Sequence, residues 1–259
     1  MRCAGVVVPA ILAGVDEVQI VVAHSERATL RVGDIFLKVD SNQANLEVEV
    51  EAMALAPVPT PRILWHNPPA LALAAVPGTA LGVLGKPSPA SPAAWAAAGA
   101  AIRQLHEAPL PPWPGRRVDD VRTRLDTECE WLITNAVLPE ALVIRNREIA
   151  ETALRPYTPA FTHGDLQITH VFTENEALTA IIDWSEAGQD DPLWDLATLT
   201  LGHEDRLPHL LAGYGQDVDH EVIRAWWSLR SLSAARWLLE HGFDPNTPGC
   251  EFDVLRARM

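Results

Sequence analysis

Two aspartates, each next to a short apolar run, are the residues of this sequence best suited to chemistry. Asp165 lies in FTHGDLQITHVF (161–172), and Asp183 opens DWSEAGQDDPLWDLATL after a pair of isoleucines. A hard divalent cation that also binds phosphates takes only one or two protein carboxylates, and Asp183 is placed to be one. Asp165 is then free to orient a hydroxyl group or to accept its proton. Either aspartate alone is a common turn residue, but the pair, following a lysine in a strand, has the order that phosphoryl transfer requires.

That lysine is Lys38, in the apolar stretch IFLKVD. A lysine inside a strand is costly to bury unless it is paired, so a role in placing phosphates competes with an edge-strand position that faces solvent. The following helix offers three possible acidic partners, Glu47, Glu49 and Glu51, which cannot all face one way. Glu49 is favoured because it lies opposite the cleanest apolar spacing of that helix, and the other two stay open.

The elements that must position these residues change character along the chain. Residues 17–40 predict short antiparallel strands, residues 44–56 predict a helix that the following prolines end, and two further strands are expected before residue 76. A linker rich in proline, serine and glycine covers 77–90, and the rest is mostly helical. The expected fold is α+β with two lobes. The N-terminal lobe (1–76) is an antiparallel sheet with one helix, the larger C-terminal lobe (77–259) is mostly helical, the hinge lies near 74–78, and a ligand is expected between the lobes.

Composition narrows the classes of function. The chain has 259 residues, of which 48% are apolar, and its formal charge of −14 disfavours a general nucleic-acid binder. No uncharged apolar run reaches the roughly 18 residues expected of a membrane span, and Pro9 interrupts the apolar N-terminus, which argues against a signal peptide. Cys3, Cys129 and Cys250 are far apart, so neither a disulfide framework nor a zinc site is expected, which fits a cytoplasmic protein. A monomer and a dimer both stay open.

The two aspartate motifs resemble those of the aminoglycoside phosphotransferase family, which shares the protein-kinase fold. The family pattern is His-Gly-Asp-Leu, three variable residues and Asn, then Ile-Asp-Trp and Asp-Pro-x-x-Asp-Leu-Ala; this chain has HGDLQITH and IIDWSEAGQDDPLWDLA. LRVGDIFLKV, VPTPRIL, VPGTAL and IRQLHEAPL resemble other family segments more weakly. The resemblance implies a two-lobe protein-kinase-like fold and a phosphotransferase with an alcohol group as acceptor. It also implies ATP or GTP as phosphate donor and Mg2+ as cofactor.

The resemblance implies roles for the C-terminal motif residues. Asp165 is the catalytic aspartate, Asp183 binds magnesium, and His163 and Asp195 support the catalytic loop, although Asp195 also fits an ordinary acidic residue at a helix N-terminus. Where the family usually has asparagine as second metal ligand, this chain has His170. Imidazole can bind magnesium but prefers softer ions. The macrolide phosphotransferase branch resembles this pattern and also has histidine there, which favours His170 as a metal ligand in an active enzyme.

Nucleotide-binding roles follow from the same resemblance. Lys38 contacts the α- and β-phosphates, with Glu49 as its partner. The hinge from Ala74 to Val76 binds the nucleobase through backbone hydrogen bonds. The segment VAHSERATL lacks the glycines of a phosphate-binding loop, and Ser25 is the residue that could contact phosphate instead.

The acceptor is less determined by the sequence. An aminoglycoside is a polycation and would bind carboxylates, for which Glu186 and Asp190 are candidates. A macrolide is large and apolar, and Trp226 could line its site, although the helical face of this tryptophan fits a core position as well. A small metabolic alcohol is a third acceptor class. The leading hypothesis is phosphorylation of an antibiotic-like hydroxyl compound, and the alternative is a kinase-like protein that binds nucleotide or ligand without transfer.

Overall fold

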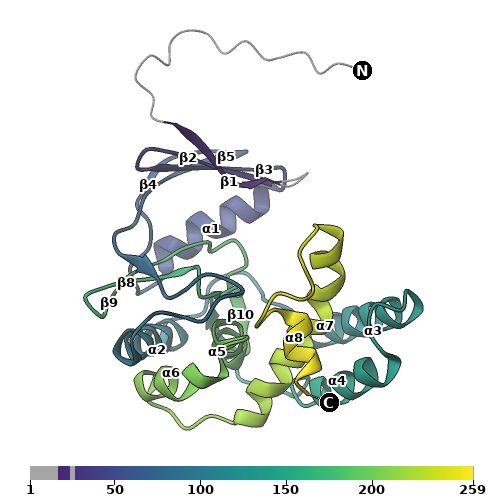
Figure 1. The fold of residues 1–259 in the computed structure, drawn as a ribbon. Helices are drawn as coiled ribbons and strands as arrows, with labels where there is room; N and C mark the ends of the chain where they lie inside the picture. Colours follow the sequence, from purple (N-terminus) through teal and green to yellow (C-terminus); the bar gives the residue numbers. More distant parts are fainter. Residues whose placement is uncertain (1–16, 24–26, 259) are drawn as a thin grey trace, which may run out of the picture. The chain divides into compact units, whose positions relative to one another are not determined.

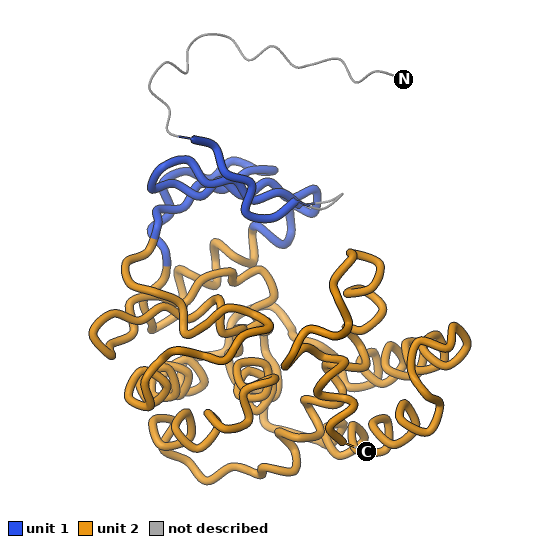
Figure 2. The backbone as a smooth tube through the Cα atoms, in the orientation of Figure 1, with its two compact units in different colours: residues 1–46, 61–75 blue, residues 47–60, 76–259 orange. Residues whose placement is uncertain are grey.

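The computed structural model describes residues 17–23 and 27–258, and the chain divides into two compact units (Figure 2). The first unit comprises residues 1–46 and 61–75, and the second comprises residues 47–60 and 76–259. The helix α1 (Gln43–Leu55) begins in the first unit and continues in the second, whereas the predicted division at residue 76 keeps this helix whole. No helix in the described ranges is long and apolar enough to cross a membrane.

The first unit is built on a five-stranded antiparallel sheet with the strand order β1-β2-β3-β5-β4. Its strands are β1 (Val18–Ala23), β2 (Arg27–Val32), β3 (Ile35–Asp40), β4 (Ile63–Asn67) and β5 (Ala70–Ala74). Lys38 lies on the central strand β3, opposite Thr29 on one side and Leu71 on the other, and only 7% of it is exposed. The alternative of an edge-strand lysine facing solvent is therefore wrong, because both neighbouring strands pair with β3.

Helix α1 buries one of its three glutamates. Glu49 has no exposed surface, whereas Glu47 and Glu51 are exposed. Glu49 is spaced three and four residues from Leu46 and Met53, which are also buried, so it lies on the apolar face and not opposite to it. Glu49 therefore stays the candidate partner of Lys38 because it is buried on the apolar face of α1, and not because it lies opposite that face.

The second unit contains the remaining helices and two small sheets (Figure 1). Its helices are α2 (Pro92–Glu107), α3 (Val118–Thr134), α4 (Glu140–Glu151), α5 (Pro192–Thr200), α6 (Leu207–Tyr214), α7 (His220–Glu240) and α8 (Glu251–Arg256), with a 3-10 turn at Glu204–Arg206. Its strands are β6 (Thr79–Ala80), β7 (Ala160–Thr162), β8 (Val171–Glu174), β9 (Ala177–Ile181) and β10 (Gly188–Asp190), paired as β6-β8-β9 and β10-β7. Helix α7 packs against α3, α4, α5 and α8 and forms the centre of the helical part.

Helices α2 and α6 touch through their backbones. A Cβ atom on Gly99 would lie 2.0 Å from the carbonyl oxygen of Leu210, and one on Gly213 would lie 1.8 Å from that of Ala96. Neither distance can accommodate a methyl group, so glycine is required on both helices. The close approach also lets the hydroxyl of Tyr214, the last residue of α6, reach His106 near the end of α2 at 3.0 Å.

Candidate active site

The loop that carries Asp165 runs from the end of β7 to the start of β8. Its first turn depends on Gly164, whose φ of 86° lies in the left-handed region. A Cβ at this position would lie 2.0 Å from the carbonyl oxygen of Glu186, so only glycine fits. The Asp165 loop therefore packs directly on the segment that follows Asp183.

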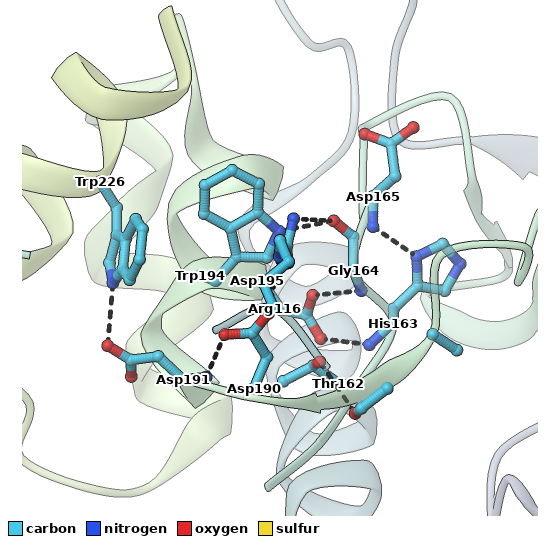
Figure 3. Close-up of polar contacts among 12 residues, drawn as sticks. Arg116, Thr162, His163, Gly164, Asp165, Asp190, Asp191, Trp194, Asp195 and Trp226 are labelled. Atoms are coloured by element: carbon cyan, nitrogen blue, oxygen red, sulfur yellow. Dashed lines mark hydrogen bonds and ion pairs between the residues drawn. The ribbon is translucent and has the colours of Figure 1, made fainter. Parts of the chain in front are cut away.

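Asp195, in the first turn of α5, binds the backbone of this loop (Figure 3). Its Oδ2 accepts a hydrogen bond from the His163 N–H at 2.7 Å, and its Oδ1 accepts one from the Gly164 N–H at 3.0 Å. His106 on α2 places Nε2 3.2 Å from the same carboxylate, which has no exposed surface. Burial would raise the pKa of Asp195, but His106 and His163 outweigh burial and hold that pKa below its usual value. Asp195 is thus a buried anion beneath the loop, and not an ordinary surface charge at a helix N-terminus.

His163 braces the loop in a single tautomer. Its Nε2 lies 2.9 Å from the carbonyl oxygen of Ile182, which can only accept, so Nε2 carries the proton. Its Nδ1 then accepts a hydrogen bond from the Asp165 N–H at 3.3 Å. Burial lowers the pKa of His163, which keeps the ring neutral as this pattern requires. With both nitrogens engaged, His163 supports the backbone and has no nitrogen left for proton transfer.

Two side chains that the sequence reasoning missed hold the Asp165 carboxylate. Gln167 Nε2 lies 3.0 Å from Oδ1 and 2.9 Å from Oδ2, and Arg230 Nη2 on α7 lies 3.0 Å from Oδ1. Burial would raise the pKa of Asp165, but Arg230, His170 and Gln167 together hold it below its usual value. The carboxylate is therefore ionised at neutral pH. Its side chain is 21% exposed, which leaves room for a hydroxyl group.

The sequence did contain a signal for Arg230. The residue interrupts the largely apolar run WWSLRSL, just as Lys38 interrupts IFLKVD. A cation in such a run is expected to have a carboxylate partner. Gln167 carried no comparable signal, because a polar residue in a loop is ordinary.

His170 and Asp183 lie side by side in an arrangement that suits a divalent cation. His170 Nδ1 lies 2.8 Å from the carbonyl oxygen of Asp165, so Nδ1 donates and Nε2 keeps a lone pair. Nε2 lies 3.8 Å from Asp183 Oδ2, which is too long for a hydrogen bond. Asp183 has a φ of 66°, and such strained backbone is frequent at functional sites.

This donor pair fits Mg2+ bound together with a nucleotide. The described residues contain no group of three or more His, Cys, Asp or Glu side chains that could hold a metal ion. Magnesium usually takes one or two carboxylates and completes its octahedral shell with phosphate and water oxygens. His170 and Asp183 could therefore supply the protein ligands, with the imidazole as the less usual one.

Two of the three acceptor candidates are buried and hydrogen-bonded within the second unit. Asp190 is 4% exposed and accepts hydrogen bonds from Arg116 Nε at 2.6 Å and from the Tyr157 hydroxyl at 3.1 Å. Trp226 is also 4% exposed and donates from Nε1 to Asp191 Oδ2 at 2.9 Å (Figure 3). These contacts favour a role in supporting the fold, because neither side chain offers surface to an acceptor.

Glu186 is the acceptor candidate whose surroundings favour the prediction. The residue is exposed. Desolvation by neighbouring atoms and then the charge of Asp165 raise the pKa of Glu186. The effect of Asp165 is the repulsion between the two carboxylates. A cationic group on an acceptor would relieve this repulsion.

The predicted nucleotide-binding residues have diverse environments. Lys38 is buried in its sheet, whereas Ser25 lies outside the described residues. The N–H of Ala74 donates to the carbonyl oxygen of Arg62 at 2.9 Å, so this amide is already engaged and cannot bind a nucleobase. Val76 is partly exposed. The nucleotide roles of Lys38, Glu49, Ser25, Ala74 and Val76 stay predictions.

Comparison with protein families identifies the class of protein. The sequence profile described as the phosphotransferase enzyme family matches residues 11–231 of this chain. The chain belongs to this family. The prediction that the phosphotransferase is an enzyme acting on hydroxyl groups is thereby confirmed. A search of the curated proteins found no match to the phosphotransferase.

Solved structures share the fold of this phosphotransferase. A choline/ethanolamine kinase family protein from Mesorhizobium loti is 22% identical with a TM-score of 0.70, covering 97% of this chain and 91% of that one. A thermostable mutant of aminoglycoside phosphotransferase APH(4)-Ia is 17% identical with a TM-score of 0.66, covering 94% and 95%. The macrolide 2'-phosphotransferase MphH from Brachybacterium faecium is 20% identical with a TM-score of 0.62, covering 93% and 94%. At these identities the likeness shows the fold, and the predicted protein-kinase-like α+β fold is confirmed.

Proposed function

We propose that this phosphotransferase moves the γ-phosphate of ATP or GTP to a hydroxyl group of a small molecule, in a reaction that requires Mg2+. The observation that carries the proposal is an ionised, partly exposed Asp165 beside the His170–Asp183 pair on a loop that Asp195 holds. Solved structures of similar fold support a nucleotide donor: APH(2'')-Ib is ADP-bound, and a related APH(2'') enzyme is in complex with GDP and kanamycin.

In this mechanism Asp165 orients the acceptor hydroxyl and accepts its proton as the oxygen bonds to the γ-phosphorus. The bond from that phosphorus to the β–γ bridging oxygen breaks, and the nucleoside diphosphate leaves. Oδ2 of Asp165 suits the hydroxyl better than Oδ1, because among the described residues Gln167 contacts both oxygens but Arg230 contacts only Oδ1. When bound by His170 and Asp183, Mg2+ neutralises charge on the phosphate oxygens.

The acceptor that the site favours is a hydroxyl compound with an amino group. Glu186 is exposed, and the charge of Asp165 raises its pKa even though Arg116 and Arg230 act in the opposite direction, so a further cation near Glu186 would be favourable. Aminoglycosides meet this requirement, and spectinomycin is bound in a solved structure of similar fold. A macrolide and a small metabolic amino alcohol are the alternative acceptors, since structures of both kinds of kinase share the fold.

Nucleotide binding and acceptor-dependent turnover test the proposal. Thermal unfolding is measured with ATP or GTP, with and without Mg2+, and nucleoside diphosphate release is measured against a panel of aminoglycosides, macrolides and amino alcohols. We expect Mg2+-dependent stabilisation and acceptor-dependent release that Asp165→Asn lowers by about 10²-fold or more. A protein that no nucleotide stabilises, and that releases no diphosphate with any acceptor, contradicts the proposal.

One observation favours a second candidate, a kinase-like protein that binds nucleotide without transfer. His170 occupies the position where an amide oxygen would suit a hard cation better. His170→Asn separates the two functions, because an active site should keep or gain Mg2+-dependent turnover with the amide. Nucleotide affinity that is the same with and without Mg2+, in both proteins, would support the binding-only candidate.

A further inference from the structure

Arg230 is a buried cation with unused hydrogen-bond donors. Its side chain is 17% exposed, and its Nη2 donates to the carboxylate of Asp165 at 3.0 Å. Its Nε is buried and has no hydrogen-bond partner among the described residues. A guanidinium carries five N–H donors, and a buried donor without a partner is destabilising and needs an explanation. Nε itself is enclosed by its neighbours, but the exposed part of the side chain can donate to a ligand beside Asp165.

The loop that carries Asp165 and the segment that carries Asp183 provide no lysine or arginine side chain. Residues 163–187 contain no lysine or arginine. Phosphoryl transfer spreads negative charge over the three equatorial oxygens of the moving group, and an arginine supplied in cis can stabilise that charge. Arg230, far away in sequence, places a guanidinium within hydrogen-bond distance of Asp165.

The guanidinium is also held in a defined position. Its Cζ lies 5.9 Å from the ring centroid of Trp194, and Arg116 Cζ lies 4.0 Å from the same ring. The Trp194 Nε1 donates to the Gly164 carbonyl oxygen at 2.5 Å (Figure 3), so the ring that contacts Arg230 also binds the catalytic loop. Such a fixed charge needs little reorganisation when a reaction takes place beside it.

We propose that Arg230 binds the transferring phosphoryl group in addition to holding Asp165. Nη2 keeps its bond to Oδ1 of Asp165, while the N–H groups on the exposed part of the guanidinium donate to the γ-phosphate oxygens as negative charge accumulates there. Arg230 stays protonated throughout, because the hydroxyl proton goes to Asp165 and the leaving oxygen belongs to the nucleoside diphosphate. This inference rests on the proposed function, since it requires a nucleoside triphosphate donor.

A binding experiment tests the inference without a known acceptor. The probe is the nucleoside diphosphate with Mg2+ and aluminium fluoride, whose planar anion imitates the transferring phosphoryl group. In the unsubstituted protein, fluoride should strengthen diphosphate binding. In Arg230→Gln, the fluoride-dependent gain should fall about tenfold or more, as expected when one donor to the transition-state charge is removed. Binding of the diphosphate and Mg2+ alone should change less than about threefold, because Arg230 is not assigned to the ground-state complex.

Arg224→Gln is the matched control. Arg224 lies on the same helix, but its side chain is 49% exposed and paired with Glu221, so it should keep the full fluoride effect. Arg230→Lys keeps the positive charge and should retain part of the effect, which a merely structural role would not produce. Circular dichroism and the thermal unfolding midpoint establish that each variant is folded, and Arg230→Lys provides the test if Arg230→Gln is not.

The outcomes separate this inference from the proposed function. If no nucleotide binds the unsubstituted protein, the proposed function and this inference both fail. If nucleotide binds but fluoride adds nothing, or adds equally in Arg230→Gln, the role of Arg230 is overturned while the proposed function stands. Once an acceptor is known, Arg230→Gln should lower kcat about 10²–10³-fold with little change in the nucleotide KM. The loss should persist in the Asp165→Asn background; if it vanishes there, Arg230 acts only by positioning Asp165.

Discussion

Replacing Asp195 with asparagine removes the buried negative charge that binds the backbone of the Asp165 loop. The carboxylate, which has no exposed surface, accepts hydrogen bonds from the backbone N–H groups of His163 and Gly164 and contacts His106. An asparagine has nearly the same shape but only one accepting oxygen. Whichever way the amide is turned, its NH2 group must face at least one backbone N–H donor.

The size of the loss follows from these contacts. A hydrogen bond to a charged acceptor contributes about 1.5–3 kcal/mol, and a buried donor left unsatisfied costs about 1–3 kcal/mol. We therefore expect Asp195→Asn to lower the free energy of unfolding by about 3–5 kcal/mol. Because domains are typically stable by about 5–15 kcal/mol, the variant should still fold. Turnover should fall as well, since the backbone before Asp165 loses its anchor.

Urea unfolding measured side by side tests this value. The control is Asp126→Asn, the same change at a side chain that is 57% exposed and bonded to Arg147, where the expected loss is below about 1 kcal/mol. A loss in Asp195→Asn no larger than in Asp126→Asn would refute the assignment of Asp195 as the loop anchor.

The stability difference between the unsubstituted protein and Asp195→Asn should depend on pH. The folded pKa of Asp195 lies below its usual value, because His106 and His163 outweigh burial. The unfolded state therefore takes up the proton first, so the stability from this carboxylate is present above the unfolded pKa of about 3.9 and is lost as the pH falls towards the folded value. The stability difference between the unsubstituted protein and Asp195→Asn should shrink as the pH is lowered below about 4. A difference that stays constant over this range, measured by urea unfolding, would contradict the lowered pKa.

Three further predictions concern other parts of the second unit. Burial raises the pKa of the Cys129 thiol to about 11, so at pH 8 only about one such thiol in a thousand is ionised. Cys250 is less buried, and peptide mapping after iodoacetamide treatment should show that it is labelled far faster than Cys129. Gly213→Ala should lower stability by about 2 kcal/mol in thermal or urea unfolding, because the clash with Ala96 exceeds the roughly 1 kcal/mol that alanine contributes in a helix; an unchanged or raised stability would contradict the close contact. Asp183→Asn should reduce the Mg2+-dependent part of nucleotide stabilisation and leave the metal-free part unchanged, and equal loss of both parts would argue against a metal ligand.

Much of the fold followed from local patterns in the sequence. The short alternating runs predicted the strands of 17–40, and the helix that follows them is α1. The chain after the linker is mostly helical, as expected, and its first helix α2 begins at Pro92 with Ser91 as N-cap. The short strands β7, β8 and β9 lie around the loops that carry Asp165 and Asp183, whereas β10 is the polar segment Gly188–Asp190, which no strand pattern marks.

Candidate site residues were predictable where a charged residue interrupts an apolar run. They were not predictable where only tertiary contacts determine the role of a side chain. Lys38 and the motif aspartates stand out against apolar neighbours. Asp190 and Trp226 carry the same residue types as an acceptor site would, and only their burial against Arg116 and Asp191 separates the two roles. Such contacts join residues far apart in the chain, and a local pattern contains no information about them.

The glycine contact between α2 and α6 sets the distance between two helices that support the loop carrying Asp165. Gly99 and Gly213 let the two helices approach until their backbones touch, and this separation brings His106 to 3.0 Å from the Tyr214 hydroxyl. His106 in turn contacts the carboxylate of Asp195. The displacement that one methyl group between the helices causes would thus reach the loop without altering any group that touches substrate. Turnover in this enzyme should respond to mutations in a helix seam that screens confined to the active site would overlook.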